Sequence, residues 1–265
     1  GGAASTENTK FTGAGSFTVL VINDYVAALV GKNVTLILTD GLTVKAASKV
    51  NAVTIAGSVA YGGSKSAGVG INTIIHNSKV NAGLGDGSTV TGANGGSWNG
   101  DVTISASGEL DLTSILVAAA ASSSKSGNGT QAAGEGVVNI FVNGNSVTAE
   151  IGKNATIKTK GNVKVTAASR LGYTGITGGI AASGGHGIGA SVSVIVVNTN
   201  TLTQIGNGAN ITAGGNLTVS ADSEETIVAV IVNGAAVGSN GVAAAVSPAV
   251  HVLQGSTVAR AGNGT

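Results

Sequence analysis

The chain of 265 residues contains no cysteine and no methionine, one proline and one tryptophan, and only three tyrosines and three phenylalanines. Without cysteine there is no disulfide framework and no metal site built on thiolates. Charged residues make up 9% of the chain, well below the ~25% of an average globular domain. The formal net charge is +1 and no basic cluster is present, so we expect no nucleic-acid partner.

Glycine and small or β-branched residues are abundant instead. The chain has 44 glycines, and 42% of its residues are hydrophobic, mainly alanine, valine and isoleucine. High hydrophobicity with low charge excludes disorder, and glycine without a three-residue period excludes collagen. Two runs without charged residues, Leu171–Ala221 and Thr226–Ala259, are interrupted by glycine and asparagine. We therefore expect β structure with polar turns and no membrane span.

A repeated stretch gives the organisation of the chain. Ala46–Gly87 aligns without a gap with Ala167–Gly208. Within it an asparagine follows an apolar run, a glycine-led turn comes eight residues later, and a short alternating strand ending in alanine follows. The asparagines are Asn23, Asn77 and Asn198, with Gly144 and Gln254 in the same slot of the other copies, and the turn glycines are Gly31, Gly85, Gly152, Gly206 and Gly262.

The spacing of the turn glycines predicts one continuous unit over residues 1–265. Successive turn glycines are almost evenly spaced, except for a longer interval between Gly85 and Gly152. A recurring period of about 54 residues is typical of solenoids and repeat arrays. The surplus in the long interval falls in two segments rich in glycine, serine and asparagine, 92–100 and 122–135. Such segments are typical of insertions at surface turns.

Local patterns predict an all-β, parallel β-solenoid. Segments such as Leu42–Ala46 alternate with period two, turns come every few residues, and no stretch has helical periodicity. We expect each repeat to form about three short coils. The recurring asparagines would hydrogen-bond along a ladder, and the turn glycines would supply positive backbone angles at corners.

No constellation of side chains predicts catalysis. The acidic residues are scattered, and Asp24, Asp40 and Asp101 could meet only if the fold brought them one coil apart. Enzymes on β-helices need converging carboxylates for acid–base chemistry or for Ca²⁺, so we expect no enzyme, no metal and no cofactor. The three histidines, His76, His186 and His251, have no partner at metal-ligand spacing and are expected at turns or on the surface.

Trp98 is the strongest candidate for ligand binding. It lies in the inserted segment 92–100, among glycine and asparagine, and exposed aromatic side chains are enriched at recognition sites. The alternative is that the indole folds back and covers the side of the solenoid.

The stretch Gly187–Ala221, GIGASVSVIVVNTNTLTQIGNGANITAGGNLTVSA, resembles the repeats of leukotoxin-like filamentous adhesins. These are very large proteins that Gram-negative bacteria export by type V routes. The resemblance extends over nearly the whole chain. It implies a right-handed parallel β-helix, a secreted or outer-surface location, and adhesion or cytotoxicity towards host cells. It also implies that the chain is a segment of a longer passenger.

The sequence thus predicts a structural stalk segment of a secreted or surface-exposed adhesin or toxin, with the host-cell surface or extracellular matrix as partner. Three alternatives remain open: a solenoid that binds a glycan or receptor through its inserted loops, a carbohydrate-active enzyme, and an ice-binding array of threonine ranks. Uncapped ends would also permit end-to-end self-association.

Overall fold

The computed structural model describes residues 1–5, 10–123, 131–238 and 240–265. Strands dominate these residues, and a short 3₁₀ turn, η1 (Ala93–Gly95), is the helical element among them. The strands are β1 (Gly2–Ala4), β2 (Thr12–Val30), β3 (Thr35–Ile37), β4 (Leu42–Gly62), β5 (Lys65–Leu84), β6 (Thr89–Thr91), β7 (Val102–Ser122), β8 (Ala132–Ile151), β9 (Thr156–Thr159), β10 (Val163–Ser183), β11 (His186–Ile205), β12 (Asn210–Ala213), β13 (Leu217–Val237), β14 (Ala243–Val246) and β15 (Ala249–Ala261). The prediction of an all-β chain is confirmed.

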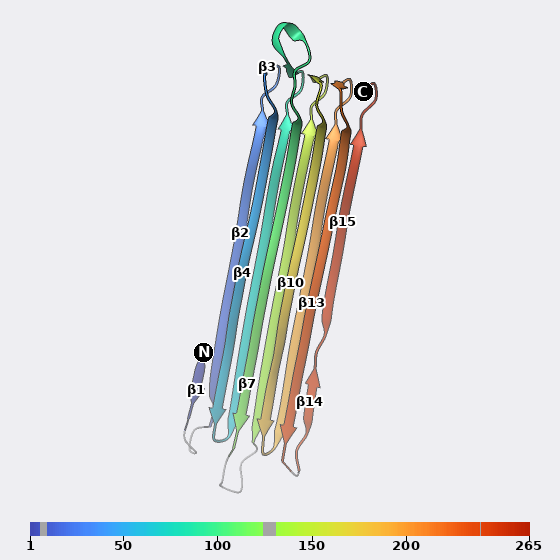
Figure 1. Ribbon diagram of the computed structural model, residues 1–265. Coiled ribbons are helices and arrows are strands. Elements are labelled where there is room, and N and C mark those ends of the chain that lie inside the picture. Colours follow the sequence, from blue (N-terminus) through green and yellow to red (C-terminus); the bar gives the residue numbers. More distant parts are fainter. Residues whose placement is uncertain (6–9, 124–130, 239) are drawn as a thin grey trace.

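The strands form three parallel sheets. Sheet A has the order β1-β4-β7-β10-β13, and sheet B has the order β14-β11-β8-β5-β2, with β15 also paired to β11. The short sheet C has the order β12-β9-β6-β3. Figure 1 shows the long strands of sheets A and B side by side, with sheet C at one end, which we call the turn end. Each repeat therefore contributes one strand to each sheet.

Strand register follows the repeat. Asn23 pairs with Asn77, and Asn77 with Gly144. Asn198 pairs with Gly144 on one side and with Gln254 on the other. The slots aligned in the sequence are thus neighbours in sheet B, as the repeat predicts.

The prediction of about three short coils per repeat is wrong. Neighbouring strands within a sheet are one whole repeat apart, and the long strands of sheets A and B run without a corner. Other glycines lie inside these strands. Gly68 is an example in β5, where a Cβ would come within 2.6 Å of the carbonyl oxygen of Ala119 in the facing sheet. Close approach between the sheets, and not a bend, explains the glycine there.

Both insertions lie between strands. Leu42 pairs with Val102, and Val102 pairs with Val163. The number of residues between the partners of each of these pairs is larger than the number between Val163 and its partner Leu217, which are separated by a repeat without insertion. The first insertion lies between β6 and β7. The second lies between β7 and β8. Its residues 124–130 are outside the described residues, while the ends of the predicted range 122–135 belong to these strands.

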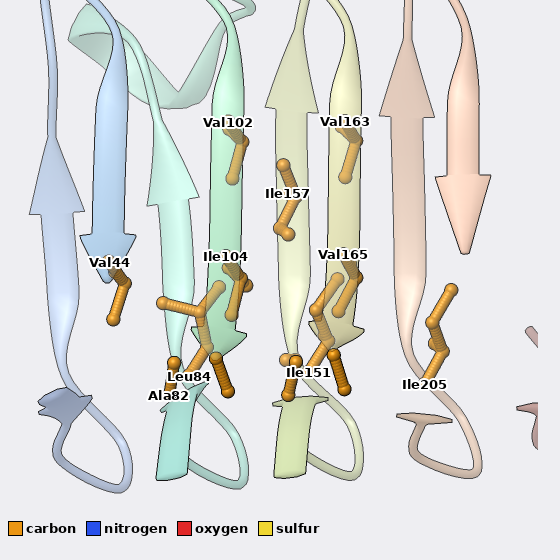
Figure 2. Packing of buried hydrophobic residues seen from close by; sticks show 14 of the residues in the cluster. Val44, Ala82, Leu84, Val102, Ile104, Ile151, Ile157, Val163, Val165 and Ile205 are labelled. Carbon is orange, nitrogen blue, oxygen red and sulfur yellow. The ribbon is translucent and has the colours of Figure 1, made fainter. Parts of the chain in front are cut away.

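The largest cluster of the apolar core lies near the turn end, between the inner faces of sheets A and B, and smaller clusters around Phe141 and Leu116 lie further along the strands. Val44, Val102 and Val163 come from sheet A, and Leu84 and Ile151 come from sheet B. Figure 2 shows these side chains between the strands. Stacking one strand on the next repeats the same apolar position at each level, which buries a continuous column of valine, isoleucine and leucine.

Candidate functional site

The turn glycines stack on one another where sheet B leads into sheet C. A Cβ on Gly85 would lie 2.6 Å from the carbonyl carbon of Gly31, and one on Gly152 would lie 2.5 Å from that of Gly85. From the second turn onwards, the first glycine of the turn is therefore needed for close stacking. The positive backbone angle falls on the third residue instead, at φ 54° for Asn154. Either asparagine or glycine occupies this position in all five turns, because both tolerate this conformation.

Side chains at the second turn position tie neighbouring turns together. Asp86 Oδ1 accepts a hydrogen bond of 2.9 Å from the backbone N–H of Lys153. Asn207 Oδ1 accepts one of 3.1 Å from Asn263. The backbone N–H of Lys153, and after it the Lys32 ammonium 3.1 Å from Asp86 Oδ2, lower the pKa of the Asp86 carboxyl. These contacts fix each turn on the one before it.

A groove of about 520 Å³ runs along these turns on the sheet B side. Its lining includes Lys153, Glu150, Gln204 and Arg260. Gln204 donates to Glu150 Oε2 at 2.8 Å, and Arg260 Nη2 donates to Gln204 Oε1 at 2.7 Å. The polar groups of the groove thus bind one another across strands. Their mixed donors and acceptors would suit a hydroxyl-rich ligand.

Trp98 is buried, with 4% of its surface exposed, so the prediction of an exposed aromatic is wrong. Its indole packs with Val90, Val102 and Ile157 in the apolar core. Its backbone pairs with Thr159, the last residue of β9 in sheet C. The inserted chain folds back to complete that sheet, and this places the ring over the end of the core.

The exposed part of the insertion is its tip. Residues 93–97 are exposed and form a protrusion at the turn end, around η1 (Figure 1). The loop is closed by a hydrogen bond of 2.7 Å from the N–H of Gly92 to the carbonyl of Gly96. A further bond of 2.8 Å from the N–H of Lys160 to the carbonyl of Trp98 anchors it to sheet C. A recognition site in this loop would use its small polar tip and not the indole.

Burial of Trp98 predicts its fluorescence. As it is the one tryptophan of the chain, native emission should be blue-shifted and weakly quenched by acrylamide, and unfolding should shift it to the red. Trp98→Phe should lower the free energy of unfolding by about 1–2 kcal/mol, because the smaller ring leaves part of the site empty. Native emission at the wavelength of free tryptophan would contradict the burial.

The asparagine row of sheet B is partly a ladder. Asn77 Nδ2 donates to Asn23 Oδ1 at 3.0 Å, as predicted. Gly144 interrupts the row at the next strand, and Asn198 follows it. The row lies on the outer face of the sheet, at its surface.

His76 lies inside the protein, 3% exposed, so its predicted place at a turn or on the surface is wrong. Its Nδ1 is 2.7 Å from Asn143 Oδ1, and its Nε2 is 3.5 Å from Asp24 Oδ1. Asp24 Oδ2 also accepts hydrogen bonds from the hydroxyls of Ser48 and Ser78. The ring thus joins three neighbouring strands of sheet B, β2, β5 and β8, and the hydrogen bond from Ser48 of β4 to Asp24 links this buried polar cluster to sheet A. His186 and His251 are exposed, as predicted.

The three aspartates singled out in the sequence do not converge. Asp24 belongs to the cluster around His76. Asp101 Oδ1 accepts a hydrogen bond of 2.7 Å from the backbone of Asn162, and Asp40 Oδ1 accepts one from the N–H of Gly41. Asp40 and Asp101 thus stabilise turns between sheets C and A.

A row of alternating charge crosses the outer face of sheet A. Lys49 Nζ lies 3.0 Å from Glu109 Oε1, and Arg170 Nε lies 3.9 Å from Glu224 Oε2. Successive strands contribute these four residues in order. Opposite charges in adjacent strands favour the observed register.

The interior away from the turn end contains a network of buried polar side chains beside smaller apolar clusters, and this network was not predicted from the sequence. Asn72 Nδ2 lies 2.8 Å from Ser114 Oγ and 3.1 Å from Thr54 Oγ1. Asn139 Nδ2 donates to Tyr173 Oη at 2.9 Å. Burial raises the pKa of the Tyr173 hydroxyl. The available signal was a change of phase within strands such as β4, where polar residues move to the alternate positions.

Glu135 is the most deeply buried carboxylate of this interior, with 5% of its surface exposed. Its Oε1 is 3.5 Å from Ser191 Oγ, and its Oε2 has no hydrogen-bond partner among the described residues. Desolvation raises the pKa of Glu135 to about 7. Gly179 and Gly189 leave the space that its carboxyl group occupies.

Among the described residues, no group of three or more histidine, cysteine, aspartate or glutamate side chains could hold a metal ion. In the same part of the chain, no helix is long and apolar enough to cross a membrane. Comparison with family models, curated proteins and solved structures finds no match to this chain.

Proposed function

We propose that the three sheets are the faces of a right-handed parallel β-helix in which one repeat makes one turn. The path from β2 through β3 and β4 to β5 is a crossover between parallel neighbours of one sheet, and such crossovers are right-handed in nearly all proteins. Sheet C closes the turn between the long strands. A single wide coil of this kind takes the place of the three coils expected for each repeat.

We further propose that the chain is a shaft segment of a secreted or surface-exposed bacterial adhesin or toxin that attaches to host cells or matrix. The uninterrupted register between repeats supports it most directly: β4, β7 and β10 pair over their whole lengths. The ion pairs between strands and the stacked turns add further contacts. Each of these contacts joins a repeat to its immediate neighbour. A structure of this kind becomes longer as repeats are added, and it holds distant repeats in fixed positions along its axis. The unpaired edges of outer strands such as β2 would permit end-to-end association.

Cell binding tests the shaft role. We expect the purified 265-residue protein to show no saturable binding to host cells or to immobilised matrix proteins. Saturable binding that survives replacement of the exposed tip 93–97 would overturn a purely structural role.

The second candidate is a ligand-binding coil, supported by the protruding tip 93–97 and the polar groove beside Lys153 and Gln204. It predicts saturable binding of a glycan or receptor that is lost when the tip is exchanged for serine and glycine or when Gln204→Ala is introduced. We propose no enzymatic activity, because the aspartates at the turns and the outer charges serve as structural contacts.

A further inference from the structure

In most of the long strands the outward-facing side chains change from polar to apolar halfway along the strand. Near the turn end the strands bury valine and isoleucine and expose residues such as Thr43, Lys45 and Lys164. In the other half they expose mainly apolar residues and bury polar ones together with apolar ones such as Ala56, Leu116 and Val137. The buried polar residues of that half include Thr54, Ser58, Ser66, Asn72, Ser114, Glu135, Asn139, Thr177, Ser191 and Ser193. The far half therefore departs from the usual arrangement of a protein in water, because its outer face is apolar while its interior mixes polar and apolar side chains.

On sheet A the far half exposes a broad apolar surface. Val53, Ile55 and Val59 of β4 point outwards, and Ile55 is 72% exposed. In register with Ile55 lie Ile115 of β7, Ile176 and Val230. Over this stretch each strand presents apolar residues or glycine at most outward positions.

The outer face of sheet B carries a matching surface. Phe17 of β2 is 71% exposed, and Ile71, Val138 and Val192 follow it in register across the sheet. The next two rows towards the turn end are built in the same way, from valine, isoleucine and one threonine, whereas the row on the other side consists of Gly15, Val69, Gly136 and Ala190. We call the two surfaces together the apolar belt, defined by β7 residues 113–121 and β5 residues 67–75 with their partners in register.

The two surfaces lie at the same level of the molecule. Asn72 of β5 and Ser114 of β7 hydrogen-bond across the interior, so their outward neighbours Ile71 and Ile115 are on opposite sides of one layer. Residues 113–121 of β7 rise about 26 Å at the ~3.3 Å per residue of a strand. The hydrocarbon core of a bilayer is about 30 Å thick.

Polar groups bound the belt at both ends. Towards the turn end the charged row that includes Lys49 and Arg170 crosses sheet A, and Lys79 lies on sheet B. At the far end Lys65 and the exposed His186 begin the strands of sheet B. Within the belt, the backbone groups of inner strands are paired between parallel neighbours. At these inner strands, an apolar band with polar margins and a paired backbone meets the requirements of a hydrocarbon environment.

From these observations we propose that the apolar belt binds lipid, with the far half of the long strands inserted among the acyl chains of a bilayer. A protein partner or a second copy docked on one sheet would leave the opposite apolar surface in water. Lipid contacts both surfaces at once and also leaves the polar side chains of the interior enclosed, where they bind one another. This proposal goes beyond the shaft role and does not depend on it.

Flotation with vesicles tests the proposal. The full 265-residue protein should float with phosphatidylcholine vesicles in a density gradient, equally at low and high salt, because apolar contact is not screened. The variant Ile71→Thr, Ile115→Thr, Ile140→Thr, Val142→Thr and Ile176→Thr replaces outward residues and retains β-branched side chains. Its lipid-bound fraction should fall about tenfold or more, because each change removes apolar area from the belt.

The matched control is Lys45→Thr with Lys164→Thr, two outward substitutions outside the belt, which should float like the parent. Circular dichroism establishes that each variant is folded. A parent protein that stays at the bottom of the gradient would overturn the proposal. A second outcome would also overturn it: neither protein floats, and light scattering without lipid shows that the parent self-associates while the belt variant is monomeric. A second copy of the chain would then cover the belt.

Discussion

Gly152→Ala should lower the free energy of unfolding by about 3 kcal/mol or more. The new Cβ would lie 2.5 Å from the backbone nitrogen of Asp86 and 2.5 Å from the carbonyl carbon of Gly85. Both atoms belong to the neighbouring turn, whose position is fixed by the hydrogen bond of 2.8 Å from the N–H of Gly152 to the carbonyl of Leu84. The stack has to open to admit a methyl group. Urea unfolding of the purified protein measures the difference.

Gly136→Ala is the control, because it makes the same chemical change in the adjoining strand β8. No atom lies within 4 Å of a Cβ at that position. Alanine also favours a strand slightly more than glycine does, because it restricts the unfolded chain. The control should therefore be neutral or slightly stabilising. Equal losses in the two variants would contradict the stacking argument.

Glu135→Gln should stabilise the protein by about 2–3 kcal/mol at pH 8 and have little effect at pH 4. Burial raises the pKa of Glu135 from 4.5 to about 7 in the folded protein. Below pH 4.5 the carboxyl is neutral in both the folded and unfolded states. As the pH rises towards 7 the unfolded chain releases this proton first, so the stability of the parent falls across that window and then stays low.

The measurement is the unfolding free energy of parent and variant in urea between pH 4 and pH 8. The difference between them should grow with pH and level off above about 7. Glu109→Gln is a control of opposite sign: the Lys49 ammonium lowers the pKa of Glu109, so its contribution is present at neutral pH and is lost as the pH falls. A constant difference between the parent and Glu135→Gln would show that Glu135 does not titrate in this window.

Both predictions bear on how neighbouring repeats fit together. Gly152 sits where turns stack, and Glu135 sits where a single repeat departs from its neighbours, which carry Gly68 and Gly189 at the paired positions. The first position repeats in every copy and can be found by aligning the sequence with itself. The second is unique, and its burial depends on the strands that cover it.

The repeat, the β structure and the register could be predicted from the sequence alone. Apolar and polar residues alternate locally, and a fixed period places Asn23, Asn77 and Asn198 in one row wherever the strands stack. The positions of both insertions also follow from counting, because extra residues must lie between segments that keep their register. These properties depend on the chain's own spacing and require no knowledge of what lies opposite each side chain.

The tertiary structure decided which residues are inside. Glycines such as Gly68 are compatible with a corner or with close contact between sheets, and only the facing strand settles the choice, so the number of coils per repeat could not be predicted. Trp98 is buried because sheet C has room for one more pairing at Thr159. The apolar belt has the same origin: where both faces of a strand carry small or apolar residues, alternation alone does not distinguish inner from outer, and the hydrogen bond between Asn72 and Ser114 fixes the polar face inside.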